Sequence, residues 1–393
     1  MRILIWSHAG CHTGFATVTD NLARRFAAMG ADCHVLAINY QGDPWPAPYK
    51  LYPASKYEKT DVHGLGRLRE LHDRLKPDVF FIVNDLGDAE AGKNALGGSF
   101  LIPTVLYAPI DGIRLPKSWQ RAMQSATKTV LMSRFGERVV REEFGIEAGA
   151  IWHGVEHDLV FPVSAGHPIR TVNQGHETLI MNKSDAKRFL NLQDRFVILA
   201  ANRNASRKNY YDTVRVFAEF HRRHPDALLY IFAVRVDEGG DLQELLEKYD
   251  LKPDSVILDS RGDTFIGVPK QYLTLLYNAA DVKLSTSTGE GFGLTDAEAV
   301  ACGVPVVAQD CSATTEVVGP AGLLAPIERH ITNYNLVDYA LPDLGKIDEA
   351  LETLYHDDAL RNRLGQLGMV HAKQFDWDVA AERFFHIFRE VSS

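Results

Sequence analysis

Short apolar runs alternate along the chain with longer segments in which apolar residues recur every three or four positions. Residues 2–6 form the first run, 17–29 the first amphipathic segment, and 33–38 the run that begins the next repeat. Continuous apolar runs predict buried strands, and recurrence at three and four positions predicts helices with one buried face. The alternation therefore favours parallel sheets with helices on both faces.

The alternation passes through the chain in two cycles. The first cycle continues with helices at 68–75 and 119–126 and strands at 79–83, 103–107 and 129–132. The second has strands at 196–200, 227–233, 256–258 and 282–285 and helices at 211–221, 242–248 and 270–278. A segment that must bend, 152–162, lies between the cycles and is predicted to be a hinge. The polar segments 164–177 and 332–343 carry no periodic pattern and are predicted to be loops.

Length and composition agree with two such units. A chain of 393 residues is too long for one ordinary core, and we place the domain boundary after residue 160. The contents of 46% hydrophobic and 24% charged residues are those of a soluble globular protein. We expect a cytoplasmic protein without a transmembrane segment, because no apolar stretch approaches the roughly 18 residues that a span requires. The oligomeric state is left open.

Charge and cysteine content narrow the classes of partner. The net charge of −9 disfavours sequence-independent binding of nucleic acid, although a local basic patch is compatible with it. The four cysteines show no metal-binding spacing and are expected to be reduced packing residues. No Asp-x-Asp or His/Cys grouping indicates a metal, and we predict neither a catalytic metal nor a cofactor.

The most informative segment is 289–308, in which Glu290 and Glu298 flank a glycine-rich loop that leads into a helix. Good helix formers occupy 297–301, and Gly303 and Pro305 stop the helix before an apolar strand. Backbone N–H groups at a helix N-terminus bind anions, most often phosphates. Two carboxylates beside a phosphate are better suited to hydroxyl groups on either side of it. A nucleotide sugar has hydroxyl groups in both places.

A basic turn supplies positive charge at a neighbouring strand end. Arg203, Arg207 and Lys208 follow the strand at 196–200, and ligands of open α/β sheets bind at the carboxyl ends of strands. Arg203 and Lys208 are therefore candidates to neutralise a diphosphate and to stabilise the charge that grows on it as it departs.

These motifs together resemble those of retaining glycosyltransferases of family four, which have the GT-B fold. The resemblance rests on Glu290-x7-Glu298, Arg203-x4-Lys208, the run 277–282 and Phe375-x-Trp377, and it is strongest in the second half. It implies two Rossmann-like doubly wound domains facing across a cleft. Residues 1–160 would form the acceptor side and 161–375 the donor side, while residues 376–393 would form a helix crossing back to the N-terminal domain.

The resemblance also implies individual roles. Glu298 would bind the ribose hydroxyls, Glu290 a sugar hydroxyl, and Arg203 and Lys208 the diphosphate. The loop containing Gly14 would close over the donor from the other domain. Backbone amides that would meet the sugar and phosphates belong to Gly291, Phe292, Gly293, Leu294 and Thr295.

One position departs from the family pattern. Many members have a histidine after the strand that corresponds to 103–107, where this chain has the sequence Tyr-Ala-Pro-Ile-Asp-Gly at 107–112. Asp111 could replace the histidine in binding the sugar or positioning the acceptor, or it could cap the following turn.

Other polar residues are expected to have smaller or purely structural roles. Asn84 and Asp85 end a strand and could contact the acceptor, although an ordinary strand-end turn is favoured. His153 is expected to be structural within the hinge, and Glu316 is expected to suit the dipole of its own helix without a ligand.

The favoured function is retaining transfer of a hexose-type sugar from a nucleotide-diphosphate sugar to an acceptor hydroxyl. The acceptor could be a glycan, a lipid-linked glycan at the inner membrane surface, or a small molecule. One alternative is another GT-B enzyme, such as a nucleotide-sugar epimerase or a sugar-phosphate synthase. A donor-binding protein without turnover is the other.

Overall fold

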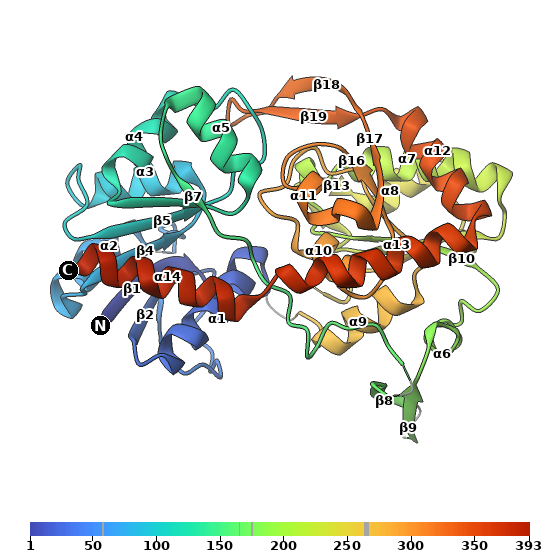
Figure 1. Cartoon of the computed structure of the whole chain (residues 1–393), viewed down its shortest axis with the longest axis horizontal. Coiled ribbons are helices and arrows are strands. Elements are labelled where there is room, and N and C mark those ends of the chain that lie inside the picture. Colours follow the sequence, from blue (N-terminus) through green and yellow to red (C-terminus); the bar gives the residue numbers. More distant parts are fainter. Residues whose placement is uncertain (57–58, 165, 174–175, 263–266) are drawn as a thin grey trace.

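The computed structural model describes residues 1–56, 59–164, 166–173, 176–262 and 267–393. It contains two parallel sheets, each covered by helices, that lie side by side along the long axis (Figure 1). The predicted α/β architecture of two doubly wound domains is confirmed. Within the described residues, no helix combines the length and apolar character needed to cross a membrane.

The N-terminal sheet has seven strands in the order β3-β2-β1-β4-β5-β6-β7. Its strands are β1 (Arg2–His8), β2 (Asp32–Ile38), β3 (Lys50–Pro53), β4 (Val79–Val83), β5 (Thr104–Ala108), β6 (Lys128–Leu131) and β7 (Gly149–Ala150). Its helices are α1 (Gly14–Ala28), α2 (Leu65–Leu75), α3 (Leu86–Ala95), α4 (Lys117–Ser125) and α5 (Arg134–Phe144). All neighbouring strands pair in parallel, so the loops after β1, β4 and β5 gather at one edge.

The C-terminal sheet has six parallel strands in the order β14-β11-β10-β15-β16-β17. Its strands are β10 (Phe196–Ala201), β11 (Ala227–Phe232), β14 (Val256–Asp259), β15 (Val282–Ser285), β16 (Val306–Gln309) and β17 (Gly322–Ala325). Helices α6 (Lys183–Phe189), α7 (Tyr210–Arg223), α8 (Leu242–Lys248), α9 (Lys270–Ala279), α10 (Leu294–Ala301), α11 (Thr314–Val318), α12 (Leu344–His356) and α13 (Asp358–His371) accompany it. The 3₁₀ turns are Ser206–Lys208, Gly319–Ala321 and Ala372–Gln374, and a small antiparallel pair joins β12 (Val236–Asp237) to β13 (Gly240–Asp241).

The last helix, α14 (Trp377–Ser392), lies on the N-terminal domain (Figure 1). Its apolar face packs with α1 and β4, where Phe384 and Phe388 both contact Phe81. Arg25 of α1 forms an ion pair with Asp378 at the start of the helix. The chain thus crosses between the domains twice, once through the hinge segment and once before α14.

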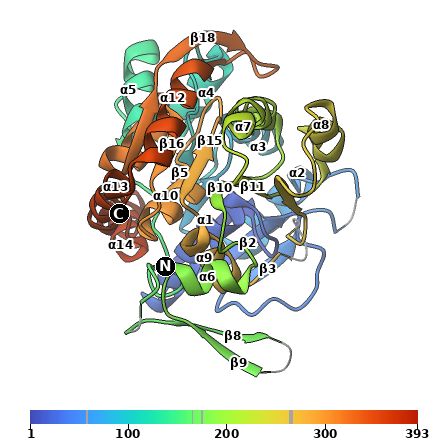
Figure 2. The same cartoon turned by 90° about the vertical axis from the view of Figure 1, so that its right-hand side faces the viewer.

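Both segments predicted to be loops contain strands, and the prediction is wrong at those positions. β8 (Ile169–Asn173) pairs with β9 (His176–Ile180) in a hairpin that projects from the body of the molecule (Figure 2). β19 (Asp338–Pro342) lies in the second segment and pairs with β18 (Ile327–Thr332), which ends where that segment begins. Polar and charged residues interrupt β8, β9 and β18, and β19 is a run of five residues that ends in a proline, so these strands lack a regular apolar pattern.

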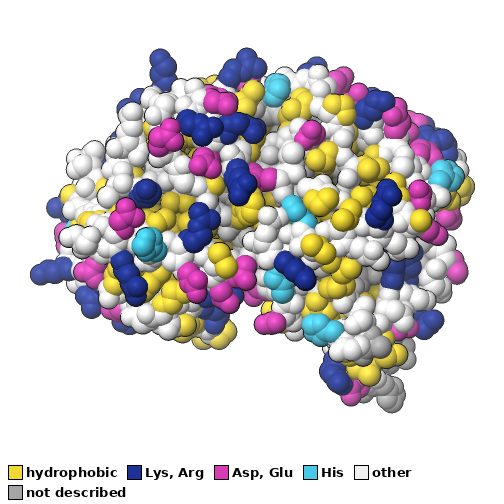
Figure 3. Space-filling view, viewed as in Figure 1, with side chains coloured by type: hydrophobic (Ala, Val, Ile, Leu, Met, Phe, Trp, Pro, Cys, Tyr) yellow, Lys and Arg dark blue, Asp and Glu magenta, His cyan; other side chains and the backbone are white. Residues whose placement is uncertain are grey.

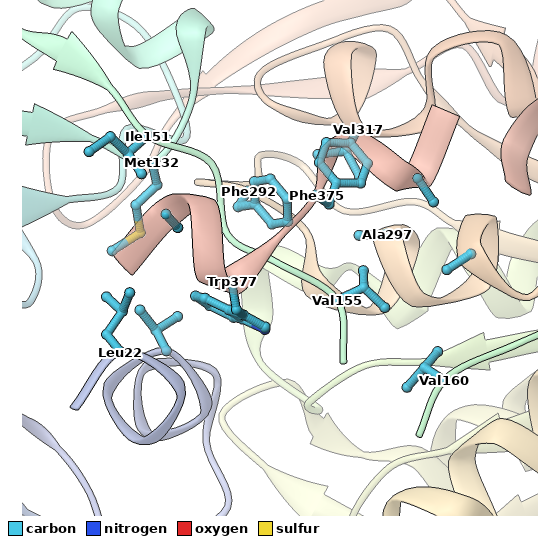
Figure 4. Packing of buried hydrophobic residues seen from close by; sticks show 14 of the residues in the cluster. Leu22, Met132, Ile151, Val155, Val160, Phe292, Ala297, Val317, Phe375 and Trp377 are labelled. Carbon is cyan, nitrogen blue, oxygen red and sulfur yellow. The ribbon is translucent and has the colours of Figure 1, made fainter. Parts of the chain in front are cut away.

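An aromatic cluster fills the junction between the domains, and Figure 4 shows three of its members, Phe292, Phe375 and Trp377, among the buried hydrophobic residues around them. His153 of the hinge segment stacks on Trp377 and also contacts Phe292 of the glycine-rich segment. Neither ring nitrogen of His153 has a hydrogen-bond partner within the described structure, and burial lowers the pKa of the imidazole to about 3. His153 is therefore a neutral packing residue, in agreement with the structural role expected of it.

Candidate active site

The glycine-rich segment forms a buried turn that leads into α10. Gly293 has φ +99, a left-handed conformation that glycine adopts without strain, and it is the residue from which α10 begins. Gly303, with φ +74, follows the helix and directs the chain into β16. Glu290 lies in this turn and Glu298 in the middle of α10, with residue exposures of 3% and 5%. Such burial requires partners for both carboxylates.

Glu290 lies between two cations from the turn after β10. Its carboxylate accepts hydrogen bonds from Lys208 Nζ at 2.5 Å and from Arg207 Nη1 at 3.0 Å. Burial raises the pKa of Glu290, but the charges of Lys208 and Arg207 outweigh it and bring the pKa to about 2. The N–H of Glu290 donates to Ser312 Oγ at 2.9 Å, which fixes the backbone of the turn. The structure therefore holds Glu290 ionised and rigidly placed.

Arg203 does not join this group. Its guanidinium pairs with Asp237 at 2.8 Å and with Glu238 at 2.8 Å, and its side chain is 52% exposed. Arg207, which the sequence analysis gave no role of its own, lies beside Glu290, because the 3₁₀ turn Ser206–Lys208 directs both of its cations to the same carboxylate. The sequence signal that could have identified Arg207 is its position next to Lys208. The role of Arg203 toward a diphosphate stays a prediction.

Glu298 has its own pair of partners, both from α9. Its carboxylate accepts hydrogen bonds from Tyr277 Oη at 2.8 Å and from Lys270 Nζ. These contacts hold Glu298 within α10, as Lys208 and Arg207 hold Glu290 in the turn before the helix. Lys270 lies 28 positions from Glu298, and no sequence motif connected the two.

The glycines of the turn allow the N-terminal domain to touch it directly. A Cβ atom on Gly289 would lie 1.9 Å from the carbonyl oxygen of Asp111, and one on Gly291 would lie 2.2 Å from Cβ of Pro109. No side chain fits at either position without moving the domains apart. A Cβ atom on Gly14, at the start of α1, would lie 4.0 Å from Cδ1 of Leu294. Both domains thus contribute backbone to the space around Glu290.

Two other members of the segment also have defined places. The side chain of Phe292 packs in the aromatic cluster against His153, so only its backbone is available to a ligand. The Thr295 hydroxyl donates to Asn202 Oδ1 at 2.9 Å and ties α10 to the end of β10.

Asp111 reaches the same space from the end of β5. Its carboxylate accepts a hydrogen bond from Tyr339 Oη at 3.2 Å and lies 3.9 Å from Arg207 Nε. Burial raises the pKa of Asp111, and the charge of Arg207 opposes the rise. Arg207 therefore stands between the carboxylates of Asp111 and Glu290, which come from different domains.

Tyr339 belongs to the β18–β19 hairpin, which joins the two domains. The backbone of Asp338 exchanges hydrogen bonds with Ile113 at 2.8 and 3.1 Å, and its carboxylate pairs with Arg114 at 2.5 Å. On the other side, the N–H of Ala340 donates to the carbonyl of Thr288. The segment predicted to be a loop is thus a strap beside the site.

Glu316 forms a second connection between the domains. Its carboxylate accepts hydrogen bonds from the N–H groups of Arg134 and Phe135 at 3.1 and 3.0 Å and from Trp152 Nε1 at 2.7 Å. Glu316 does lie in the first turn of its own helix, α11, as expected, and no feature of the sequence indicated that its carboxylate also caps α5 of the other domain. A cavity of about 620 Å³ adjoins this contact and extends to Asp111.

One group of side chains in the described structure has metal-ligand chemistry: His224, Glu352 and His356. It lies on α12 and at the end of α7, outside the arrangement around Glu290, and Arg223 already pairs with Glu352 at 2.7 Å.

On the face seen in Figure 3, acidic and basic side chains are interspersed, with no continuous basic surface.

Comparison with known proteins places this arrangement. Residues 182–368, which contain both glutamates and the basic turn, match the family model described as glycosyl transferases group 1. This part of the chain is therefore similar to group 1 glycosyl transferases. The chain is similar to a D-inositol 3-phosphate glycosyltransferase of Corynebacterium jeikeium, with 32% identity over 181 residues. That match covers 45% of this chain and 39% of the relative, so the chain spans less than half of the relative's length.

Solved structures extend the likeness from residues 182–368 to the whole fold. Sucrose-phosphate synthase from Thermosynechococcus elongatus superimposes with a TM-score of 0.73 at 19% identity, covering 99% of this chain and 98% of that one. Anabaena HepE in complex with UDP-glucose gives a TM-score of 0.71 at 14% identity, covering 99% and 100%. At these identities the likeness shows the fold, and the fold is GT-B, as expected from the sequence.

Proposed function

We propose that this protein transfers a hexose-type sugar from a nucleotide-diphosphate sugar to an acceptor hydroxyl, with retention of anomeric configuration and without a catalytic metal. The observation that carries the proposal is the arrangement around Glu290. A buried carboxylate, held by Lys208 and Arg207, stands at the turn into α10 and is approached by backbone from both domains. Similarity to group 1 glycosyltransferases supports the same reaction.

The proposal gives each group a task. Glu298, within α10, would bind the ribose hydroxyls, and Glu290, in the turn before it, would bind a hydroxyl of the sugar. Lys208 and the backbone amides of residues 291–295 would stabilise the departing diphosphate, with Arg203 as a further cation. Arg203 would have to leave Asp237 and Glu238 to do so. The charge that these cations supply would make a metal ion unnecessary.

The bond changes follow from the parts. The acceptor oxygen forms a bond to the anomeric carbon while the bond from that carbon to the diphosphate oxygen breaks. The proton of the acceptor hydroxyl goes to the departing diphosphate, which leaves from the face on which the acceptor attacks. Asp111 would position the sugar or the acceptor, since it faces Arg207 from the N-terminal domain.

A thermal-shift screen of nucleotide sugars tests the first requirement, because a bound donor raises the melting temperature according to its affinity and concentration. Product analysis with the best donor then separates transfer from epimerisation, and chelator treatment tests metal independence. The expected result is one preferred donor, a product with retained configuration and unchanged activity in chelator. Absence of binding to any nucleotide sugar would refute the proposal.

A further inference from the structure

The carboxylate of Asp85 is the feature on the N-terminal side of the site that the proposed function leaves without a task. Asp85 follows β4, the strand between β1 and β5, and it immediately precedes α3. It occupies the capping position of the helix, where an aspartate normally accepts a hydrogen bond from a backbone N–H of the first turn. Asp85 makes no such bond, and within the described residues its side chain has no hydrogen bond or ion pair.

Asp85 follows β4, which pairs in parallel with β5, the strand that leads to Asp111. Desolvation by the surrounding groups and the charges of Asp111 and Asp88 raise the pKa of Asp85, and the charge of Arg207 lowers it. Tyr339, which donates to Asp111, also feels the charge of Asp85. Asp85 and Asp111 thus both follow the carboxyl ends of neighbouring strands, at the sheet edge where Arg207 approaches Asp111. Although its neighbours desolvate it, Asp85 keeps an exposed surface that a ligand can reach.

A second unpartnered polar group adjoins it. Asn84 is fully buried, with 0% exposure, and neither atom of its side-chain amide has a hydrogen-bond partner in the described structure. A buried amide without partners costs free energy and persists where a ligand or ordered water completes its bonds. Two successive residues at the end of β4 thus have unused hydrogen-bonding capacity next to the site.

The charge balance decides which ligand these groups suit. The carboxylate of Glu290 forms ion pairs with Lys208 and Arg207. The carboxylate of Asp111 lies near Arg207 and accepts a hydrogen bond from the hydroxyl of Tyr339. Asp85 is the acid of this group that has no cation or donor of its own in the described structure. A carboxylate in that situation binds hydroxyl groups as donors and repels a phosphate.

We propose that Asp85 binds the acceptor, and that the acceptor is an unphosphorylated sugar or polyol whose hydroxyl groups donate hydrogen bonds to this carboxylate. Asp85 thereby orients the attacking hydroxyl, whose proton still goes to the departing diphosphate. The inference rests on the proposed function, since it assigns the acceptor of that same reaction.

The test uses paired acceptors with the donor found by the thermal-shift screen. The pairs are glucose with glucose 6-phosphate, mannose with mannose 6-phosphate, and myo-inositol with myo-inositol 1-phosphate. Transfer is measured by mass spectrometry on the full-length protein, as kcat/KM for each acceptor. Wild type should favour the uncharged member of its best pair by at least about tenfold.

Two variants separate binding from structure. Asp85→Asn should lower kcat/KM for the uncharged acceptor by about 10- to 100-fold, the effect of removing a charged hydrogen-bond partner. The variant should also lower the ratio of kcat/KM for the uncharged acceptor to kcat/KM for the phosphorylated one, and it should leave donor affinity unchanged. Asp88→Asn removes the same charge one turn away, where Asp88 pairs with His63 at 3.3 Å, and should keep the preference.

Each other outcome overturns the proposal. A wild-type preference for the phosphorylated member would place the anion near the cavity that Arg134 and Arg138 line. An unchanged preference in Asp85→Asn would remove Asp85 from acceptor binding. Transfer to no member by a protein that binds donor would exclude this class of acceptor. Loss of donor binding in wild type would instead refute the proposed function, and the wild-type comparison stands even if a variant fails to fold.

Discussion

Replacing Glu316 with alanine removes the carboxylate that joins α11 to the N-terminal domain. Three N–H donors then lose their acceptor: the backbone amides of Arg134 and Phe135 and the indole of Trp152. A hydrogen bond to a charged group contributes about 1.5–3 kcal/mol, and a negative charge at a helix N-terminus about 0.3–1 kcal/mol. The sum would be roughly 5–10 kcal/mol if all three donors stayed dry.

Water reduces this cost. The cavity of about 620 Å³ adjoins the contact, so solvent can reach the freed amides. We therefore expect Glu316→Ala to lower the free energy of unfolding by about 2–4 kcal/mol. The loss should concern the junction, so calorimetry should show the two domains unfolding in separate transitions. Donor affinity should fall as well, because backbone from both domains surrounds the site.

Urea denaturation followed by tryptophan fluorescence measures the loss, and amide hydrogen exchange at Arg134 and Phe135 locates it. Glu137→Ala is the matched control, since Glu137 is an acid in the first turn of α5. The stability of Glu316→Gln should lie between that of the alanine variant and that of wild type. The glutamine side chain keeps one acceptor oxygen but replaces the other with an NH2 group, which cannot accept a hydrogen bond from the three donors. A loss equal to that of Glu137→Ala, with unchanged exchange at both amides, would refute the reasoning.

Three further predictions concern groups around the site. His153 has a folded pKa of about 3, so below pH 6.5 the unfolded chain binds more protons and stability falls by up to about 1.4 kcal/mol per pH unit; His153→Phe should flatten this fall in acid denaturation curves, and an unchanged slope would contradict it. Desolvation and the charges of Asp111 and Asp88 raise the pKa of Asp85 to about 7, against the opposing charge of Arg207. The kcat/KM for the acceptor should therefore rise from pH 6 to 8 in wild type and stay flat over that range in Asp85→Asn. The same rise in the variant would assign the titration to another group. Gly289→Ala places a Cβ 1.9 Å from the Asp111 carbonyl and should weaken donor binding measured by calorimetry more than Gly149→Ala, which meets open space; equal affinities would show that the domain contact is not needed.

The parts of the fold that sequence reasoning could reach are those with a strong local signal. Apolar runs identified most of the parallel strands but not β3, β7 and β17, and the change from helix formers to Gly303 identified the end of α10. Glu290 and Lys208 could be paired because each follows a strand of the same sheet. The β8–β9 and β18–β19 pairs were missed because polar residues interrupt β8, β9 and β18, although each pair has buried residues.

The rest of the site depends on distances that sequence does not record. The choice of Arg207 over Arg203 beside Glu290 follows from a single 3₁₀ turn. The partners of Glu298 come from α9, 28 and 21 positions earlier. The contacts of Glu316 and of the motif glycines exist only once the two domains are docked. Such contacts between domains require three-dimensional structure.

The central claim is that Glu290 and Glu298 serve two ends of one nucleotide sugar. It is tested most directly by measuring donor affinity and turnover together in Glu290→Gln and Glu298→Gln. The account predicts that Glu290→Gln binds donor at least as tightly as wild type, because Lys208 and Arg207 are freed, while turnover falls by about 100-fold. Glu298→Gln should weaken donor binding by about tenfold or more. Full turnover in Glu290→Gln, or unchanged affinity in Glu298→Gln, would contradict the account.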